Sequence, residues 1–466
     1  MEREDVSMKL FEPVDMRVGN PVRKIVAFTI PMLLGNVAQQ LYNTVDSIIV
    51  GRYVGDNALA AVGSAGPILN LMLVLFMGIS VGASILVSQY FGAAQREELS
   101  RSIGACITLT AIASVIIMAV GPLISRPLLR LLDTPESIID WCASYLVIIF
   151  LGIAGSGFYN ILGGVLRGLG DSVSALVYLL VATVLNIVLD WLFVARFGMG
   201  VAGVAWATVI AQAVSAVLSI WKLTRLTEIF DLKKEYLRPE KRFTGSLIRL
   251  GLPSGVTQAI FSMSLIIVQS LTNSFGEQYI AANVMVMRVD GFVMLPAFSF
   301  GTAMTTFAGQ NIGAGKPERV LSGARSGTLT AMGISAVVTL LILLVGRSIM
   351  GIFTTTEDLI NLSYRMMSIL APGYIVVEIT QCLSGIMRGA GDTVTPMWIS
   401  IISSVIIRVP LAYGMVWLSR TPENPQGNCY MMQVSLVITW AIGAIITLVF
   451  YRVGKWKSKA VATAEI

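Results

Sequence analysis

The chain contains 466 residues, of which 55% are hydrophobic and only 13% are charged. Soluble domains carry about 25% charged residues, so this composition excludes a soluble protein and indicates an integral membrane protein. The absence of histidine excludes imidazole metal sites, Ser-His-Asp triads and histidine proton relays. The four cysteines are scattered without a CxxC pair, which argues against a zinc site or a disulfide framework.

The first 20 residues are polar and show no signal-peptide pattern. Apolar segments long enough to cross a bilayer follow, and short links separate most of them. A polar link rich in Lys and Arg, residues 225–245, divides the chain in two. We therefore predict an all-α membrane protein of twelve transmembrane helices in two six-helix bundles. The spans lie near residues 22–50, 58–90, 99–122, 137–166, 173–195, 202–224, 246–274, 279–311, 320–346, 358–387, 395–418 and 430–452. The predicted parts are a tail (1–21), an N-lobe (22–226), a linker (227–245), a C-lobe (246–455) and a second tail (456–466).

Lysine and arginine are distributed unevenly over the links. If successive links alternate between two sides, the side with both termini and the central linker holds 24 of these residues. The other side holds six, and three lie within spans. The positive-inside rule then predicts that both termini are cytoplasmic. An odd number of spans would remove this asymmetry, so the orientation and the count of twelve support each other.

The two halves are sequence repeats. Three pairs of matching residues or turns lie 221 residues apart, and Pro31 and Pro253, early in the first span of each half, lie 222 apart. The three pairs are Gln89 and Gln310, Gly55 and Gly276, and the turns RGLGD (167–171) and RGAGD (388–392). Each half has an even number of spans, so we expect the halves to share one orientation and to be related by an axis along the membrane normal.

The two RGxGD turns are interpreted as structural rather than catalytic. Each is predicted at a cytoplasmic helix end, where glycine can end one helix. The following aspartate, Asp171 or Asp392, can then cap the next helix.

The first span carries a polar stripe on an otherwise apolar helix. Asn36, Gln39, Asn43 and Asp46 recur at steps of three, four and three, which places them on one helix face. A carboxylate at bilayer depth costs roughly 2.5–3.5 kcal/mol on insertion scales. We interpret Asp46 as part of an ion-binding or proton-binding site. The alternative is a stripe that only holds helices together, for which amides would suffice.

The two halves differ at the positions of deep carboxylates. Asn186 and Asp190 are four residues apart on one helix face, and Thr208 of the next span can add a hydroxyl. An oxygen cluster of these residues with Asp46 suits a small hard cation such as Na⁺. It equally suits protons, and the residues do not choose between the two. The matching positions in the second half, Val268, Ile407 and Leu411, are apolar.

The second half has its own charges within predicted spans: Arg288, Asp290, Glu378 and Arg408. One interpretation is a buried ion-pair network that fixes helix register. The other is a second ion or substrate site. Removal of one partner from a buried pair is strongly destabilising, so Arg408→Ala is expected to express poorly unless its acid partner is also neutralised.

Pro31 lies fifteen residues before Asp46 on the same predicted helix. Proline weakens a helix and permits a kink. We expect ion or proton binding at Asp46 to bias this helix between straight and bent forms, and Pro31→Ala to stop transport without loss of the fold.

The chain resembles the multidrug and toxic compound extrusion (MATE) transporters over residues 20–455. The resemblance rests on the twelve spans in two halves, the segment IPMLLGNVAQQLYNTVDSIIVGRYVG, GQNIGA, the paired RGxGD turns, and NIVLD with WAT in the fifth and sixth spans. It implies export of bulky, often cationic drugs in exchange for H⁺ or Na⁺ by alternating access of two lobes. The family's N-lobe cation site matches the four residues Asp46, Asn186, Asp190 and Thr208. Its cavity-lining positions match Gln39, Tyr42, Asn43 and Asn160. The acid that one branch carries on the seventh span has no counterpart in residues 258–262, so a C-lobe sodium site of that kind is not expected.

The residues favour a cation-coupled multidrug antiporter over three other functions. A flippase for a lipid-linked precursor remains the alternative, although its cavity should be basic whereas the N-lobe here carries acids. An enzyme is not expected, because no histidine, nucleophile or phosphate motif is recognisable, and a passive channel fits the off-centre acids less well. We expect the substrates to be small organic molecules and the protein to be a monomer in the plasma membrane. We expect no cofactor beyond the coupling ion and no nucleic-acid partner.

Overall fold

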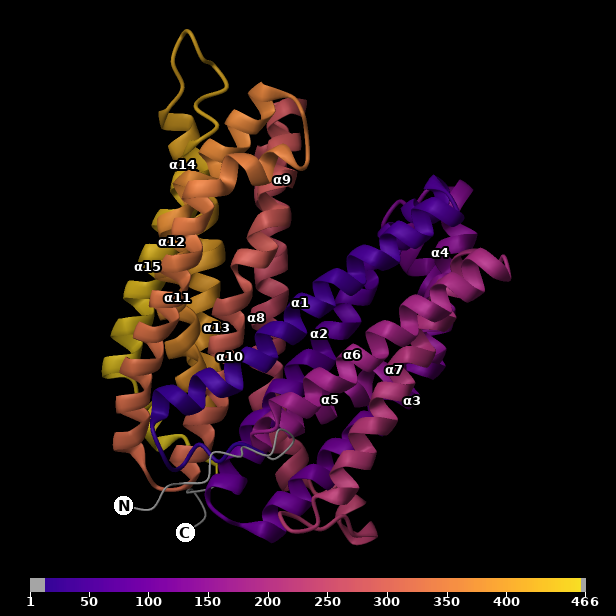
Figure 1. Cartoon of the computed structure of the whole chain (residues 1–466), viewed down its shortest axis with the longest axis vertical. Helices are drawn as coiled ribbons and strands as arrows, with labels where there is room; N and C mark the ends of the chain where they lie inside the picture. Colours follow the sequence, from indigo (N-terminus) through magenta and orange to yellow (C-terminus); the bar gives the residue numbers. More distant parts are fainter. Residues whose placement is uncertain (1–12, 462–466) are drawn as a thin grey trace. The chain divides into compact units, whose positions relative to one another are not determined.

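The computed structural model describes residues 13–461, and the predicted tail residues 1–12 and 462–466 lie outside the described part (Figure 1). Within the described residues, eleven helical stretches are long and apolar enough to cross a membrane. The pair α4–α5, bent by 54°, brings the count to twelve when it is taken as one span. The predicted all-α architecture with twelve spans is therefore confirmed.

The helices follow the repeat. The first half contains α1 (Pro21–Tyr53), α2 (Asp56–Gly92), α3 (Arg96–Leu131), α4 (Glu136–Leu151), α5 (Ile153–Leu169), α6 (Ser172–Asp190) with a π-helical turn (Trp191–Arg196), and α7 (Gly200–Arg225). A short 3₁₀ turn, Lys234–Leu237, lies in the linker. The second half contains α8 (Lys241–Asn273), α9 (Glu277–Val293), α10 (Leu295–Gly313), α11 (Pro317–Gly351), α12 (Glu357–Gly389), α13 (Val394–Ile401), a π-helical turn (Ile402–Ile407), α14 (Arg408–Leu418), α15 (Met431–Val453) and a final 3₁₀ turn (Trp456–Ser458).

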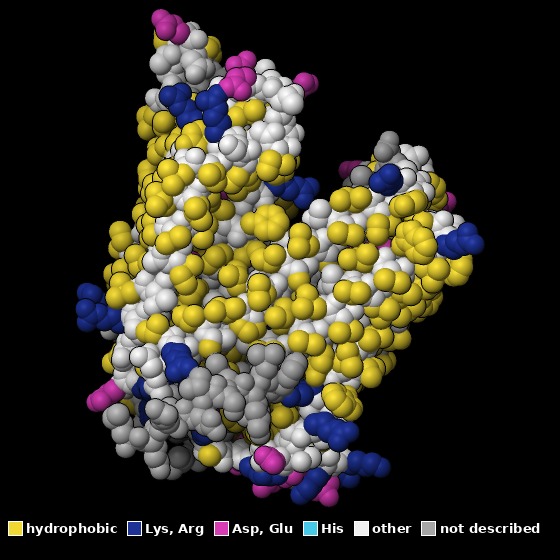
Figure 2. All heavy atoms as spheres, viewed as in Figure 1, with side chains coloured by type: hydrophobic (Ala, Val, Ile, Leu, Met, Phe, Trp, Pro, Cys, Tyr) yellow, Lys and Arg dark blue, Asp and Glu magenta, His cyan; other side chains and the backbone are white. Residues whose placement is uncertain are grey.

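The chain forms two compact units. Unit 1 comprises Met1–Asp15 and Ile30–Gly255, and unit 2 comprises Met16–Thr29 and Val256–Ile466. The helices α1 and α8 each change unit within a few residues of a proline, Pro31 in α1 and Pro253 in α8. In each unit, apolar side chains cover the middle of the visible face and charged side chains gather near the helix ends (Figure 2). This distribution is the one that a bilayer requires.

Matching glycines confirm the sequence repeat at the level of backbone conformation. Gly55 and Gly276 precede α2 and α9 with φ of 104° and 87°, and both have ψ near 180°. Gly170 and Gly391 end α5 and α12 with φ of 95° and 96°. A side chain is strained at such angles, which explains why glycine recurs at the same offset.

Two further glycines let helices approach closely inside each unit. A Cβ placed on Gly168 of α5 would lie 2.7 Å from the carbonyl oxygen of Ser84 in α2. A Cβ placed on Gly389 of α12 would lie 2.2 Å from the carbonyl oxygen of Thr305 in α10. Small residues at such crossings are typical of membrane helices, which gain stability mainly from close packing.

The aspartates of the RGxGD turns cap the next helix, as predicted. Asp171 accepts hydrogen bonds from the backbone nitrogen of Ser174 at 2.8 Å and from its hydroxyl at 2.7 Å. Asp392 accepts from the backbone nitrogen and the hydroxyl of Thr395 at 3.2 and 2.8 Å. The shared role of these turns is therefore to start the fifth span of each half.

The start of α1 is anchored within unit 2 by the residue Met16. Its side chain is fully buried, and its backbone nitrogen donates to Gln310 Oε1 at 3.0 Å. Its carbonyl accepts from Asn311 Nδ2 at 3.2 Å and from the guanidinium of Arg319. The repeated glutamine motif of unit 2 thus holds the peptide that leads into the first span.

Candidate functional site

Two carboxyl groups meet inside unit 1. Asp46 lies on α1, and Asp190 is the last residue of α6, where a π-helical turn begins. Asp190 is fully buried and Asp46 is partly buried. The two carboxyl groups lie close enough to interact directly with each other. Two negative charges at such a distance repel each other, so the pair favours the uptake of a proton or another cation.

An amide and a hydroxyl complete this cluster. When its amide is oriented to satisfy both neighbours, Asn186 donates to Asp190 Oδ2 at 2.8 Å and accepts from the backbone nitrogen of Thr208 at 3.3 Å. The same amide lies 3.5 Å from the Thr208 hydroxyl. The four residues predicted to form an oxygen cluster are therefore brought together from α1, α6 and α7.

Two tyrosines border the carboxyl pair. The Tyr42 hydroxyl lies 3.4 Å from that of Thr208, so Tyr42 belongs to the same network. Tyr145 of α4 is buried and lies close enough to interact electrostatically with both carboxyl groups and with Tyr42. The sequence analysis missed Tyr145, because a tyrosine among apolar residues resembles an ordinary core position and periodicity does not show which helices meet.

The donor set suits a proton or a hard cation. One oxygen of each carboxyl group, Oδ1 of Asp46 and Oδ1 of Asp190, is buried without a hydrogen-bond partner. Carboxylate, amide and hydroxyl oxygens are the ligands that Na⁺ takes in proteins. No group of three or more Cys, Asp or Glu side chains is placed to hold a metal ion in the described part of the chain. A bound cation here would therefore depend on the two aspartates together with neutral oxygens.

A family model and two relatives identify the family of this chain. The family model described as MatE matches residues 31–192 and again residues 253–414, one match in each half. The chain belongs to the MatE family. The probable multidrug resistance protein YoeA of Bacillus subtilis is 33% identical over 398 residues, which cover 84% of this chain and 86% of YoeA. The probable multidrug resistance protein NorM of Thermotoga maritima is 27% identical over 448 residues, 95% of each chain.

Solved structures support the same fold. A structure described as the outward-facing conformation of a multidrug resistance MATE family transporter of the MOP superfamily has a TM-score of 0.87 at 24% identity. It covers 97% of this chain and 98% of its own. A crystal structure of MATE in the straight conformation also gives 0.87, and one in the bent conformation gives 0.86, both at 24% identity. At this level of identity the likeness establishes the fold of this MatE chain and nothing further.

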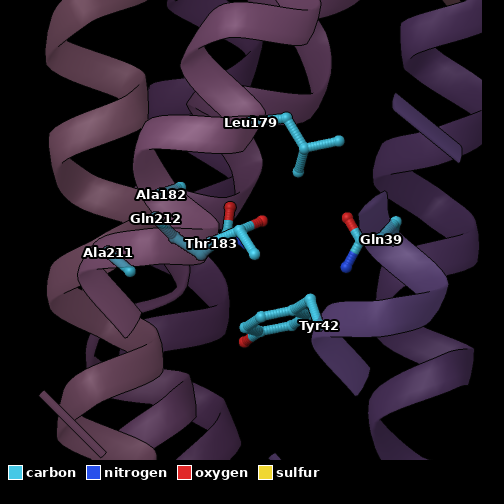
Figure 3. Close-up of a pocket in the computed structure, with 7 residues that line it drawn as sticks. All are labelled: Gln39, Tyr42, Leu179, Ala182, Thr183, Ala211 and Gln212. Atoms are coloured by element: carbon cyan, nitrogen blue, oxygen red, sulfur yellow. The ribbon is translucent and has the colours of Figure 1, made fainter. Parts of the chain in front are cut away.

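The cavity-lining residues expected from the family resemblance are found in different surroundings. Gln39 and Tyr42 line a pocket in unit 1 (Figure 3). Asn43 is exposed and accepts a hydrogen bond of 3.5 Å from Gln39 Nε2. Asn160 donates to the carbonyl of Ser156 in its own helix at 2.9 Å and does not line this pocket.

The same pocket contains two polar residues that the sequence analysis missed. Thr183 of α6 and Gln212 of α7 line it, and Thr183 Oγ1 and Gln212 Oε1 are buried without a hydrogen-bond partner. Neither residue was selected, because an isolated polar residue in an apolar span is common. A count of polar residues at helical spacing along α7 would have found Gln212, four residues after Thr208.

The predicted ion-pair network of unit 2 is not formed, and this corrects the first interpretation. No ion pair joins the four charged groups within residues 13–461: Arg288 is exposed, and Arg408 donates to Ser264 Oγ at 3.4 Å. Asp290 accepts a hydrogen bond from Tyr374, and Glu378, only 1% exposed, has its Oε2 atom unpaired. The positions of these charged residues along the chain do not determine which helix each side chain faces. The expected rescue of Arg408→Ala by an acid partner has no structural basis.

Pro31 lies inside the continuous helix α1, next to the point where this helix passes from unit 2 to unit 1. A bend at this position would redirect the segment of α1 that carries Asp46. The role of Pro31 in such a bend stays a prediction.

Proposed function

We propose that this MatE protein is a secondary active exporter of bulky, often cationic organic compounds, driven by entry of H⁺ or Na⁺. Two observations support the substrate class: relatives such as YoeA and NorM are named as probable multidrug resistance proteins, and the membrane-spanning fold is that of MATE transporters. We further propose that the chain acts as a monomer in the plasma membrane with both termini in the cytoplasm, as the positive-inside distribution indicates.

The observation that carries the coupling proposal is the contact between Asp46 and Asp190. A proton or Na⁺ on this pair removes one negative charge from a site that is shielded from water, and its departure restores that charge. The free energy of the pair therefore depends strongly on ion occupancy. Because Asp46 lies on α1 and Asp190 on α6, occupancy changes the attraction between these two helices. A change in the packing of α1 is how we expect ion binding to alter access to the substrate.

The experiment is export of a fluorescent organic cation from reconstituted vesicles, with the Na⁺ gradient and the pH gradient imposed separately. We expect one gradient or both to drive export by the wild-type protein. Asp46→Asn and Asp190→Asn keep the shape of each side chain but remove its charge, and each is expected to fold and to lose gradient-driven export.

The matched control is Asp140→Asn, which neutralises an exposed aspartate of the same unit that pairs with Arg126. It should export as the wild type does. Wild-type export by both site variants would remove the proposal. Movement of a lipid-linked sugar by the wild type without export of the organic cation would instead support the flippase alternative.

A further inference from the structure

A polar stripe runs along α7 from the carboxyl site toward the end of the helix at Arg225. Its members recur at steps of four, three, four and three, which places them on one helix face. They are Thr208, Gln212, Ser215, Ser219 and Lys222. At 1.5 Å per residue the stripe is about 21 Å long. Such a run exceeds what is needed to hold two membrane helices together, for which small residues suffice.

The facing helix α6 carries a matching set of polar groups. α6 packs directly against α7, and its polar residues occupy both ends and the middle of the contact. Asp190 and Asn186 lie at one end, Thr183 lies in the middle, and Asp171 caps the other end. The seam between α6 and α7 is thus polar from the carboxyl pair to the predicted cytoplasmic end.

The middle of this seam contains the pocket shown in Figure 3. Thr183 and Gln212 lie on one side of it, and Gln39 and Tyr42 of α1 face them from the other. The remaining lining residues are the apolar Leu179, Ala182 and Ala211. In this conformation the space is too narrow for a water molecule, although Thr183 Oγ1 and Gln212 Oε1 lack partners. Buried polar atoms without partners carry a free-energy penalty, and a water that enters with a small displacement of α1 would satisfy both.

The pocket adjoins the carboxyl pair through Tyr42. This residue lines the pocket, and its hydroxyl lies 3.4 Å from that of Thr208. Thr208 in turn lies beside Asn186, which bonds Asp190. No apolar layer separates the pocket from the carboxyl pair along this line of contacts.

Two buried serines of α7 lie between the pocket and the predicted cytoplasmic end of the helix. The Ser215 hydroxyl donates to the carbonyl of Tyr178 at 3.1 Å, and that of Ser219 donates to the Ser215 carbonyl at 2.9 Å. Beyond them, Lys222 Nζ lies 3.6 Å from Asp171 Oδ2. The seam therefore ends at an ion pair, with buried hydroxyl groups between this pair and the pocket.

We propose that Thr183 and Gln212 form a water-holding relay, through which the coupling proton passes from the Asp46–Asp190 pair along the α6–α7 seam to the cytoplasm. This inference rests on the proposed function, since it takes the carboxyl pair as the proton site. The proton leaves one carboxyl group and moves as a hydrated proton, and the pair gains one negative charge. The relay conducts only when α1 has moved away from the pocket far enough to admit water, so proton release follows the position of α1.

The test uses the reconstituted full-length protein with a pH-sensitive dye in the vesicle lumen. The variants are Thr183→Val, which replaces one hydroxyl by a methyl group, Gln212→Leu, and the two combined. Thr183→Ser retains the hydroxyl and should restore the wild-type rate. Thr330→Val is the matched control, because the Thr330 hydroxyl only bonds Ser326 in its own helix, in unit 2.

Two quantities are measured. The first is the pH dependence of the binding of a fluorescent organic cation, which reports on the carboxyl pair and should keep its midpoint in all these variants. The second is proton movement coupled to that cation, which should fall by about tenfold or more in the double variant, the scale on which positioned groups assist proton transfer.

Wild-type proton movement in the double variant, with loss of it in Asp46→Asn, would overturn the relay and leave the proposed function standing. Wild-type proton movement in Asp46→Asn would overturn the proposed function itself. A shifted midpoint in the double variant would show that the substitutions disturb the carboxyl pair and would also reject the relay. If the double variant does not fold, Thr183→Val and Thr183→Ser alone decide the matter, since their side chains differ least from that of threonine.

Discussion

In unit 1 the helix that starts at Ser172 ends at a buried carboxyl group, Asp190, whereas the matching position in unit 2 is Leu411. Asp46 corresponds in the same way to Val268, a core residue of unit 2. Around these positions the two units use the same glycine turns, the same close helix crossings and the same aspartate caps. The scaffold is thus repeated, and the polar interior of unit 1 is not.

This difference separates the residues that build a lobe from those that give it a function. Groups that both units share satisfy the demands of a membrane helix bundle, namely close packing and capped helix ends. Close packing and helix capping do not account for the polar groups that only one unit has. In unit 1 these groups form a contiguous oxygen network with unpaired carboxyl oxygens. Unit 2 holds separate charges instead: Asp290 accepts a hydrogen bond from Tyr374, and Arg408 donates to Ser264.

The largest effect is expected when unit 1 receives the apolar residues that unit 2 has at the matching positions. The triple variant Asp46→Val, Asn186→Ile, Asp190→Leu removes the carboxyl pair and its amide. We expect it to fold, since apolar replacement of buried polar groups is often neutral or stabilising. Gradient-driven export should fall by about 100-fold or more, measured as fluorescent cation efflux from vesicles. Retention of coupled export would mean that the difference between the units has no role in coupling.

The shared scaffold predicts equivalent effects in both units. Gly168→Ala and Gly389→Ala each place a Cβ against a backbone carbonyl, and each should lower the free energy of unfolding by about 1–3 kcal/mol, with the larger effect at Gly389. Thermal unfolding in detergent measures this. Gly333→Ala is the control, because nothing lies within 4 Å of the added Cβ. An unchanged melting temperature at either crossing would contradict the close packing described for that unit.

A smaller effect is expected in unit 2, at the buried residue Glu378. Its side chain is 1% exposed with Oε2 unpaired, so Glu378→Met should raise the free energy of unfolding by about 1 kcal/mol by removing a buried polar group without a partner. The exposed Glu277→Met serves as control and should not stabilise. A lower melting temperature for Glu378→Met would show an unseen partner. A simultaneous loss of export would favour the interpretation of unit 2 as a second ion site.

The smallest effect is expected outside the membrane, where the linker contacts α3. The guanidinium of Arg96, 3.0 Å from Asp231, holds the pKa of Asp231 below its usual value. A lowered pKa stabilises the fold at pH values above the unfolded pKa of aspartate, about 4, and this contribution is lost as the pH falls through the lowered value. Because the pair is exposed, Asp231→Asn should reduce the melting temperature only slightly at neutral pH. The difference from the wild type should vanish in acid, and a difference that grew with acidity would contradict the assignment.

Much of the fold could be predicted because its determinants are local. Twelve apolar segments and their caps are set by the free energy of moving each side chain into a bilayer, and this depends little on the other helices. The repeat could be found because positive φ favours glycine, and such turns recur 221 residues apart, as Gly170 and Gly391 show. Asp46, Asn186, Asp190 and Thr208 stood out because polar groups at helical spacing are rare in apolar spans.

The remaining contacts depended on how whole helices rotate and pack, which no local pattern contains. The packing of the helices brings Tyr145 of α4 to the carboxyl pair and leaves Thr183 Oγ1 and Gln212 Oε1 without hydrogen-bond partners in one pocket. It also shows that Arg408 turns to Ser264 rather than to an acid. Twelve membrane spans, two repeated halves and the acids of the first half can be read from the residues alone, because insertion energies and glycine backbone angles act residue by residue. Which oxygen atoms form one network depends on the packing of helices far apart in the chain, and the fold alone specifies that packing.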